Sequence, residues 1–477
     1  MLKSISIYGL RGFGEKGIIN FSIPDSVKEG SGLNIIVGPN NSGKTTITEA
    51  IKYYNVDSQS ISFSEGKRNA KTNFNVDIKY YDTDGSTYEV KTVEDGGSNV
   101  KTIADTGALA SKIPYCLPSR RNTDYYMYNN SEMDRYAYSI NQITNSRNRQ
   151  SNLNSYDGRI FKWQKERKNF DKVLKKILDK SVDWTIEQND EGNFYIKIIL
   201  GNNEIVHTRE GIGDGYWSIF TIVDALYDSK AGDIIVIDEP ELSIHPALQR
   251  KLVKVLEEFS KDRQIIITTH SPFFISIDAL INGGNLIRTY KDKALNIRTG
   301  EINDEDRDYF KSVKKDILNP HVMGIEGKEM FFLEDDIVIT EGQEDVIFYP
   351  IICKKLGIKL NVELFGWGSG GVNNITYLLR LLKHLGYKKL SAVFDGDQEE
   401  KYIEAKNIFK DYNILILPEE DIRDKEDEET KEIYKRGIIS KKGKIYEEHK
   451  EPFKKLIDDI NNYHKEIWFC IIFFLFL

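Results

Sequence analysis

Cysteines and long hydrophobic runs are both scarce in this sequence of 477 residues. Cys116, Cys353 and Cys470 lie far apart and match neither a zinc-binding spacing nor a disulfide framework, which favours a reducing cytosol. No signal peptide opens the chain, because its first residues lead directly into strand-like alternation. The longest apolar run, Ile467–Leu477, is shorter than the roughly 20 residues that span a bilayer. We therefore expect a cytoplasmic protein with no membrane partner.

An excess of basic residues is also absent. The formal net charge is −8, which argues against a uniformly basic coat for nucleic acid but is compatible with a local basic groove. Neither an internal repeat nor a sustained heptad pattern appears, which argues against a long coiled coil. The chain is too long for a single core, so we expect two or three domains.

The clearest motif is the segment Gly38–Thr45, which reads G-x-x-x-x-G-K-T and has the form of a phosphate-binding loop. The largely apolar stretch Leu33–Val37 predicts a buried strand before it, and residues 46–53 predict a helix after it. Glycines let successive N–H groups point at phosphate oxygens, while Lys44 would reach the β- and γ-phosphates and Thr45 would bind Mg²⁺. The predicted ATP-contacting residues are Gly38, Asn40, Asn41, Ser42, Gly43, Lys44, Thr45 and Thr46.

A second apolar strand ends in two carboxylates. Residues 234–237 run into Asp238 and Glu239, which would place Asp238 near Mg²⁺ and Glu239 beside the attacking water. Helical patterns at 216–228 and 247–260 alternate with these strands, and this alternation predicts a mostly parallel sheet.

A further strand ends in His270, and at this point the chain resembles the ABC-type ATPases, in particular the heads of DNA-repair and chromosome-organising ATPases. The resemblance implies that His270 contacts the γ-phosphate and that Ser243 or His245 meets a partner head, so that two heads bind ATP between them. The stretch Glu210–Trp217 lacks the signature serine of that family. This departure implies weaker activation by the partner and slow hydrolysis.

The region 122–183 is rich in polar and basic residues and predicts a polar insertion between the two halves of the ATPase. Phe170, Val173, Leu174 and Ile177 form one helical stripe within it. Arg120 and Arg121, just before the insertion, would reach phosphates, the partner head or solvent.

A different chemistry follows in the last third of the chain. The strand 337–339 leads to Glu341, and the strand 391–394 leads to Asp395 and Asp397. Since the carboxyl ends of parallel strands meet at one edge of a sheet, these three carboxylates are expected to converge. Hard oxygen ligands of this kind suit Mg²⁺ or Mn²⁺.

This pattern resembles the TOPRIM fold of topoisomerases, primases and a group of nucleases. A second metal ion would need a further carboxylate from Glu419, Glu420 or Asp421, of which we assign Glu420. The resemblance also implies a late basic residue near the scissile phosphate, for which the candidates are Lys441, Lys442 and Lys444.

An ABC-type head followed by TOPRIM resembles the OLD (overcoming lysogenisation defect) family, which includes the nuclease subunits of anti-phage systems such as Gabija. The resemblance implies an ATP-regulated, Mg²⁺- or Mn²⁺-dependent DNA endonuclease or nickase with Glu239, His270, Glu341, Asp395 and Asp397 in catalytic roles. It also implies a homodimer or larger homo-oligomer and a helicase-like or effector partner. The alternatives are a PARIS-like ATPase sensor or scaffold and, disfavoured by the short arm, a recombination-type repair ATPase.

The predicted fold is therefore α/β. An ABC-type P-loop ATPase domain spans 1–300, with the polar helical insertion at 122–183, and a linker spans 301–334. A TOPRIM-like parallel-sheet domain spans 335–450, and 451–477 forms a C-terminal tail. The apolar run 467–477 within this tail is a buried terminal strand, a weak anchor or a foreign addition.

Overall fold

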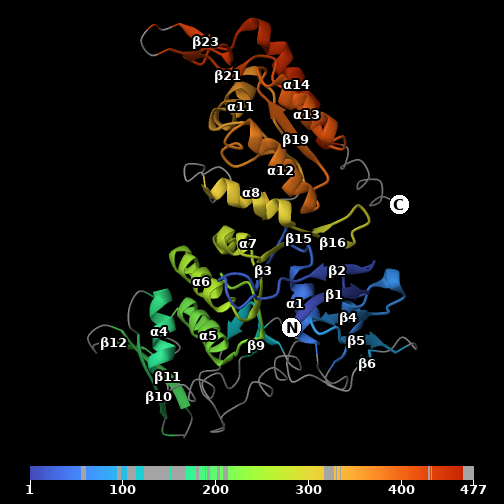
Figure 1. Ribbon diagram of the computed structural model, residues 1–477, viewed down its shortest axis with the longest axis vertical. Coiled ribbons are helices and arrows are strands. Elements are labelled where there is room, and N and C mark those ends of the chain that lie inside the picture. The colour runs from blue at the N-terminus through green and yellow to red at the C-terminus, as the bar shows by residue number, and fades with distance from the viewer. Residues whose placement is uncertain are drawn as a thin grey trace. The chain divides into compact units, whose positions relative to one another are not determined.

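The computed structural model divides into two compact units, Met1–Glu301 and Ile302–Leu477 (Figure 1). It describes residues 1–54, 61–93, 98–104, 114–122, 150–152, 167–178, 182–188, 190, 194–200, 205–207, 213–315, 327–328, 330–332, 335–427, 430 and 432–465. Within these ranges, no helix is long and apolar enough to cross a membrane. The apolar run 467–477 and most of the polar insertion fall outside them.

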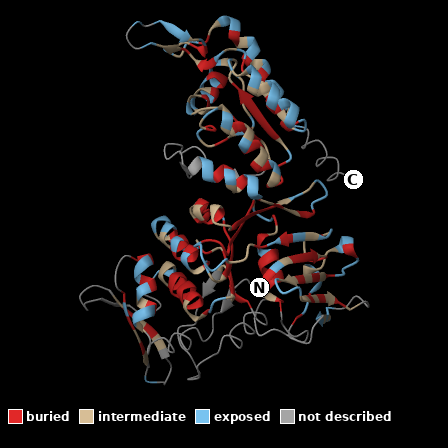
Figure 2. Cartoon of the chain, in the orientation of Figure 1, coloured by how far each residue is buried: buried red, intermediate tan, exposed pale blue. Residues whose placement is uncertain are grey.

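Unit 1 is built on a six-stranded sheet with the order β16-β15-β3-β14-β13-β7, in which all strands but the edge strand β16 are parallel. Its central strands are buried along their whole length (red in Figure 2), as continuous β-branched runs favour. The strands are β3 (Leu33–Val37), β7 (Tyr115–Leu117), β13 (Ile234–Asp238), β14 (Gln264–Thr268), β15 (Asn285–Lys291) and β16 (Ile297–Glu301).

An antiparallel sheet with the order β2-β1-β4-β5-β6 shares one core with this sheet. A hairpin turn at Asp84–Gly85 joins β4 to β5, and Gly85 supplies the positive φ of 86° that the turn needs. The strands are β1 (Leu2–Tyr8), β2 (Gly17–Asn20), β4 (Asp77–Asp82), β5 (Thr87–Thr92) and β6 (Val100–Ala104).

The helices of unit 1 agree closely with the predicted patterns. They are α1 (Lys44–Lys52), α4 (Arg167–Leu178), α5 (Asp214–Asp228), α6 (Pro246–Phe259) and α7 (Ile277–Ile281), with short 3-10 turns at Glu65–Lys67, Ala70–Thr72 and Pro272–Phe274. The stripe predicted at 170–177 is the buried face of α4, which packs against α5 and α6. Residues 194–200 form β11 (Phe194–Leu200) in a separate antiparallel sheet with β10 (Asp183–Gln188) and β12 (Ile205–His207).

Unit 2 contains a parallel sheet with the order β18-β17-β19-β20. Its strands are β17 (Ile337–Ile339), β18 (Glu363–Leu364), β19 (Leu390–Phe394) and β20 (Asn413–Ile416), and the helices between them are α11 (Gln343–Leu356), α12 (Val372–His384) and α13 (Glu399–Ile408). Short strands follow at β21 (Asp421–Arg423), β22 (Lys425–Glu426), β23 (Ile433–Lys435) and β24 (Gly437–Ile439). The α/β class and the P-loop ATPase head are thus as predicted.

Two of the predicted boundaries of unit 2 need correction. Within the predicted linker 301–334, helix α8 (Asp304–Lys315) packs on α12, where Asp306 Oδ2 lies 2.9 Å from His384 Nδ1. Within the predicted tail 451–477, residues up to 465 belong to helix α14 (Glu447–Lys465). Phe453 and Ile457 of α14 are fully buried in the core of unit 2, because they lie one turn apart on the apolar face of this helix.

Candidate functional sites

The loop between β3 and α1 has the geometry of a phosphate-binding loop. Gly38 (φ 140°) and Gly43 (φ 106°) adopt left-handed conformations that disfavour other residues. A Cβ atom on Gly38 would lie 2.2 Å from the carbonyl oxygen of Thr289, and one on Gly43 would lie 2.4 Å from the side chain of Ile297. The glycines of the motif are therefore required by close packing against β15 and β16 as well as by the turn.

Lys44 is nearly buried, and its ammonium group donates to the carbonyl oxygens of Gly38 at 2.8 Å and Pro39 at 2.9 Å. Burial lowers the pKa of Lys44 to about 8, against the opposing effect of Glu239 and Asp238. A buried ammonium with two neutral acceptors would gain strongly from a polyphosphate, so the loop fits a nucleotide. Thr45 follows Lys44 as the second residue of α1.

The predicted acidic pair lies at the end of β13, next to β14 in parallel register. The Thr268 hydroxyl donates to Asp238 Oδ1 at 2.5 Å, and the Glu239 N–H donates to the Thr268 carbonyl oxygen at 2.9 Å. Glu239 has a positive φ of 48°, a conformation that non-glycine residues adopt at a cost and that is often found at functional sites. The strand pairing therefore fixes both carboxylates at the end of the sheet.

His270 lies beside this pair, with its Nε2 3.7 Å from Glu239 Oε1. Burial, together with the charge of Lys44, lowers the pKa of His270 to about 4, so the imidazole is neutral at pH 7. Glu241, which sequence reasoning left without a role, accepts from the His270 N–H at 2.6 Å and from the Thr269 hydroxyl at 2.8 Å. Its place three residues after Asp238, separated from Glu239 only by Pro240, was the available signal.

The residues expected to meet a partner head occupy different positions. Ser243 is exposed and has a positive φ of 64°, and a Cβ on Gly215 would lie 2.4 Å from its carbonyl oxygen. His245 is also exposed, but its Nδ1 accepts from the Ala247 N–H at 3.2 Å and so caps α6. Arg120 and Arg121 start the short strand β8 (Arg120–Asn122), which pairs with β9 (Gln150–Asn152); their side chains and residues 210–212 lie outside the described part.

The three predicted carboxylates of unit 2 do converge. They follow the parallel strands β17 and β19, and the Asp395 N–H donates to Glu341 Oε1 at 3.0 Å. A Cβ on Gly396 would lie 2.3 Å from the Glu419 carbonyl oxygen, so the close approach of the chain after β20 requires the glycine between Asp395 and Asp397. Close packing therefore explains the D-G-D spacing.

A lysine that sequence reasoning missed joins these carboxylates. Lys435 Nζ lies 2.9 Å from Asp397 Oδ2, 3.3 Å from Asp421 Oδ2 and 3.5 Å from Asp395 Oδ2. Desolvation lowers the pKa of Lys435, but the hydrogen bond to Asp397 and the charges of Asp395 and Asp421 outweigh it and raise that pKa overall. We call Glu341, Asp345, Asp395, Asp397 and Asp421, with Lys435, the acidic cluster.

The fourth carboxylate of this cluster differs from our assignment. Glu420 is exposed and its Oε2 accepts from the Arg436 N–H at 2.9 Å, whereas Asp421 shares Lys435 with Asp395 and Asp397. Asp421 is the first residue of strand β21 and is buried, unlike the preceding residue Glu420. Of the candidate lysines, Lys441 pairs with Glu426 at 3.4 Å instead.

Asp345 is a further carboxylate that sequence reasoning missed. It is 5% exposed and accepts from the Gly342 N–H at 2.9 Å at the start of α11. Its place four residues after Glu341, at a helix start, was a usable signal. Burial, reinforced by the neighbouring carboxylates, raises the pKa of Asp345 and Glu341 to about 7 and that of Asp395 to about 8.

The donor chemistry of this cluster fits a divalent cation, because crowded carboxylates with raised pKa values gain from added positive charge. In the structure, the cation that bridges the carboxylates is the ammonium group of Lys435. Across the residues that the structure describes, no three His, Cys, Asp or Glu side chains form a ready metal-binding group.

Comparison with known proteins supports the ATPase head. Residues 117–275 match the family model of an AAA ATPase domain (AAA_15), a segment that includes Asp238, Glu239 and His270. The chain is 24% identical over 315 residues to the Septu protein PtuA of Bacillus thuringiensis, covering 59% of this chain and 74% of that protein. It is 26% identical over 134 residues to the Old nuclease of Escherichia phage P2, covering 28% of this chain and 22% of the nuclease.

A solved SMC head bound to the C-winged helix domain of ScpA covers 66% of this chain and 99% of its own, at 16% identity and a TM-score of 0.44. The chain thus contains an AAA-type ATPase domain and is distantly similar to PtuA and to the Old nuclease.

Proposed function

We propose that this chain is an ATP-binding, divalent-metal-dependent DNA endonuclease or nickase that acts in anti-phage defence. This proposal is carried by the convergence of Asp395, Asp397 and Asp421 on Lys435 at the end of a parallel sheet, with Glu341 held beside them by the Asp395 N–H. The distant similarity to the Old nuclease and the resemblance to the OLD family agree with it.

In this proposal the TOPRIM-like sheet of unit 2 holds Mg²⁺ or Mn²⁺ through Glu341, Asp395 and Asp397, with Asp345 and Asp421 close by. A bound divalent ion supplies an activated water and stabilises the leaving oxygen of a phosphodiester. The carboxylates named above would hold the ion, and two features of the chain fix their positions. Gly396 permits the close approach of the β20 end, and the Asp395 N–H holds the Glu341 carboxylate in place.

The head would bind ATP with Lys44 and Thr45 at the phosphates, Asp238 toward Mg²⁺ and Glu239 and His270 toward the γ-phosphate. Because His270 is neutral at pH 7, it would donate or accept one hydrogen bond there and add no charge. The exposed loop at Ser243 would meet a second head, so that nucleotide binding brings two copies of the chain together.

A second candidate function is an ATPase sensor or scaffold whose unit 2 does not cleave DNA. The observation that favours it is Lys435, whose ammonium is the cation that the carboxylates hold. In such a protein, Lys435 would act as a permanent substitute for a metal ion.

The deciding experiment is cleavage of supercoiled plasmid by the full chain with Mg²⁺ or Mn²⁺, with and without ATP. We expect nicked or linear DNA from the wild type and at least a hundred-fold less from Asp395→Ala with Asp397→Ala, as for loss of a catalytic metal site. The matched control is Glu399→Ala with Glu400→Ala, which removes two exposed carboxylates at the start of α13. No cleavage by the wild type with either metal would favour the scaffold, and cleavage that survives in the Asp395 and Asp397 variant would indicate a contaminating nuclease.

A further inference from the structure

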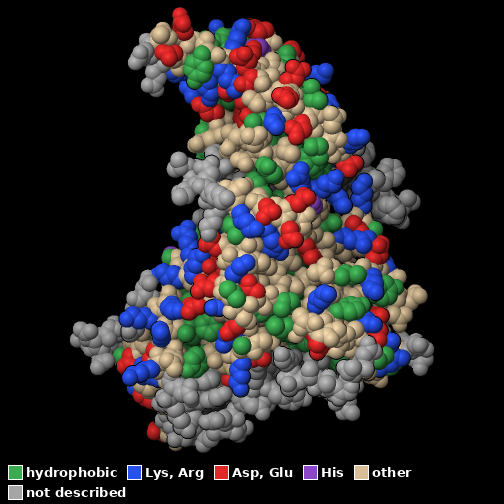
Figure 3. Space-filling model, in the orientation of Figure 1, with side chains coloured by type: hydrophobic (Ala, Val, Ile, Leu, Met, Phe, Trp, Pro, Cys, Tyr) green, Lys and Arg blue, Asp and Glu red, His purple; other side chains and the backbone are tan. Residues whose placement is uncertain are grey.

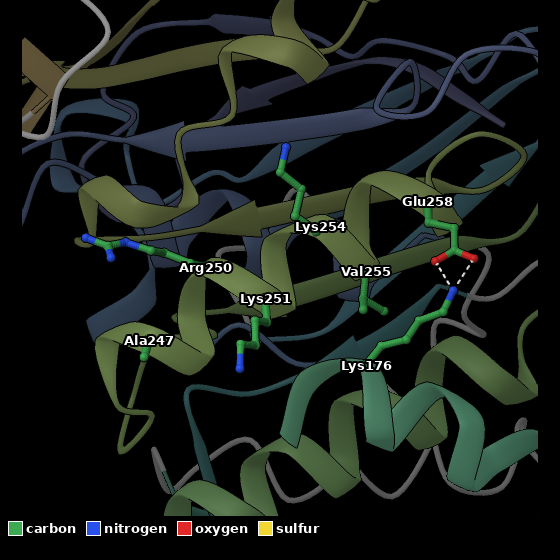
Figure 4. Close-up of a pocket in the computed structure, with 7 residues that line it drawn as sticks. All are labelled: Lys176, Ala247, Arg250, Lys251, Lys254, Val255 and Glu258. Atoms are coloured by element: carbon green, nitrogen blue, oxygen red, sulfur yellow. Dashed lines mark hydrogen bonds and ion pairs between the residues drawn. The ribbon is translucent and has the colours of Figure 1, made fainter. Parts of the chain in front are cut away.

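A groove of about 420 Å³ lies between α4 and α6 of unit 1 (Figure 4). Seven residues line it, one from α4 and six from α6. They are Lys176, Ala247, Arg250, Lys251, Lys254, Val255 and Glu258. The α6 residues recur at intervals of three and four, so they share one face of that helix, and we call this feature the α4–α6 groove.

The lining of the α4–α6 groove is strongly basic. It has four cationic side chains and one carboxylate, an excess of three positive charges in a chain whose net charge is −8. Val255 lies between Lys251 and Lys176 and provides a small apolar floor, whereas Ala247 lies beyond Arg250 at the start of α6 (Figure 4). On the face shown in Figure 3, by contrast, basic and acidic side chains are interspersed over the described residues.

The ion pairs of Lys176 and Lys254 lie at the surface, where such pairs are weak and a phosphate can replace the carboxylate. Lys176 Nζ lies 2.5 Å from Glu258 Oε2, which closes one end of the groove. Lys254 Nζ lies 2.9 Å from Glu257 Oε2 and 3.4 Å from Asp278 Oδ2, but the Lys254 side chain remains 60% exposed. Arg250 stacks over Phe273 at 4.6 Å from the ring centroid, an arrangement that holds the guanidinium in place.

The basic surface continues past the groove along α4. Lys168, Lys172 and Lys175 are exposed on the same helix as Lys176. The cations of α6 from Arg250 to Lys254 span about 6 Å along the helix axis, close to the spacing of neighbouring phosphates on one strand. Such a row suits an extended polyanion better than a single small anion.

The proposed cleavage centre cannot supply this attraction. Its five carboxylates and Lys435 make it acidic, and an acidic surface repels a phosphate backbone at long range. A nuclease of this composition therefore needs a basic surface elsewhere to bind DNA. The α4–α6 groove has the charge and the length to meet that need.

We propose that the α4–α6 groove binds the phosphate backbone of DNA without reading its sequence. The identification of the polyanion as DNA rests on the proposed nuclease function. Phosphates lie along the α6 face at Arg250, Lys251 and Lys254, and the apolar floor faces the sugars.

The test is equilibrium binding of the full chain to a fluorescein-labelled DNA duplex in EDTA, over a range of KCl concentrations. The variant is Arg250→Gln, Lys251→Gln and Lys254→Gln, and the control with the same charge change is Lys3→Gln, Lys230→Gln and Lys293→Gln, at exposed positions of unit 1. We expect the Kd of the groove variant to rise by at least about ten-fold and its slope of log K against log salt to become shallower by about 2 to 3. ATP turnover by both variants reports that unit 1 is folded.

An unchanged Kd in the groove variant, or an equal loss in the control, overturns the proposal. Polyglutamate is the second probe. If the groove variant loses affinity for polyglutamate and keeps its affinity for DNA, the groove binds an acidic protein and the proposal is also overturned. EDTA prevents cleavage, so the binding assay is independent of nuclease activity. If the wild type binds DNA through the groove but cleaves no plasmid, only the nuclease function is refuted. If the wild type cleaves plasmid but the groove variant binds DNA as tightly as the wild type, only the groove proposal is refuted.

Discussion

The nucleotide loop of unit 1 and the acidic cluster of unit 2 each place one lysine among oxygen atoms, but with opposite charge balance. Lys44 donates to two neutral carbonyl oxygens, and burial lowers its pKa to about 8. Lys435 meets three carboxylates, which raise its pKa. Within the described part of the chain, the positive charge of Lys44 is therefore free of a carboxylate hydrogen-bond partner and can attract an anion, whereas Lys435 is surrounded by more negative charges than it can neutralise. The charge balance thus favours an anionic ligand at the loop of unit 1 and leaves the acidic cluster of unit 2 with more carboxylates than cations.

The largest expected effect is that of Lys44→Ala on ATP turnover. Removing a buried cation that is aimed at the phosphates should lower the rate roughly a hundred-fold or more, which steady-state phosphate release would measure. The control is Lys52→Ala, at the far end of the same helix. If turnover persisted in Lys44→Ala, the hydrolysis would not come from this loop. That result would contradict the inference that the loop of unit 1 binds the phosphates of ATP.

A smaller effect is expected from Lys435→Met on metal affinity. The ammonium group competes with a metal ion for the oxygens of Asp395, Asp397 and Asp421, so its removal should tighten Mn²⁺ binding by roughly ten-fold. Isothermal titration with Mn²⁺ would measure this change. The matched control is Lys441→Met, since Lys441 pairs with Glu426 outside the cluster. Weaker Mn²⁺ binding in Lys435→Met would mean that this lysine supports the metal site instead of competing for it.

The two sites also differ in how far the sequence predicts them. The nucleotide loop is continuous, so its strand, glycines, lysine and helix can all be read within one short segment. The acidic cluster draws on four separate segments, and only Glu341, Asp395 and Asp397 follow strands that are plainly buried. Asp421 follows the less regular end of β20, and the choice between it and Glu420 depends on which way β21 turns.

Lys435 had no local signal at all. It lies in a charged run with several other lysines, and only the pairing of Lys425 with Lys435 in the β22–β23 ribbon brings it to the cluster. Helix α14 was missed for a similar reason, because its apolar stripe is diluted by charged residues and is recognisable only from the core that it covers. Sequence patterns predict a site whose residues lie in one continuous segment. The positions of Lys435 and helix α14 depend on pairing and packing between distant segments, which a local pattern does not contain.

The smallest expected effect concerns stability, and it tests whether the cluster is truly overcharged. The pKa of Asp395 is about 8 in the folded protein and near 4 in the unfolded chain. Between these values the unfolded chain releases the proton first, so the free energy of unfolding falls as the pH rises from about 4 to about 8. Asp395→Asn removes this penalty and should stabilise unit 2 at pH 8 by about 1 to 2 kcal/mol, less than the full shift because Glu341 and Asp345 share the protonation.

Thermal unfolding in EDTA at pH 5 and pH 8 would measure this gain, with Glu399→Gln as an exposed control. At pH 5 the gain should largely vanish, since Asp395 is already protonated in the folded protein. A gain of equal size at both pH values would indicate better packing and not relief of charge. A loss at pH 8 would show that Lys435 fully balances the carboxylates, and the contrast between the two lysines would then lose its basis.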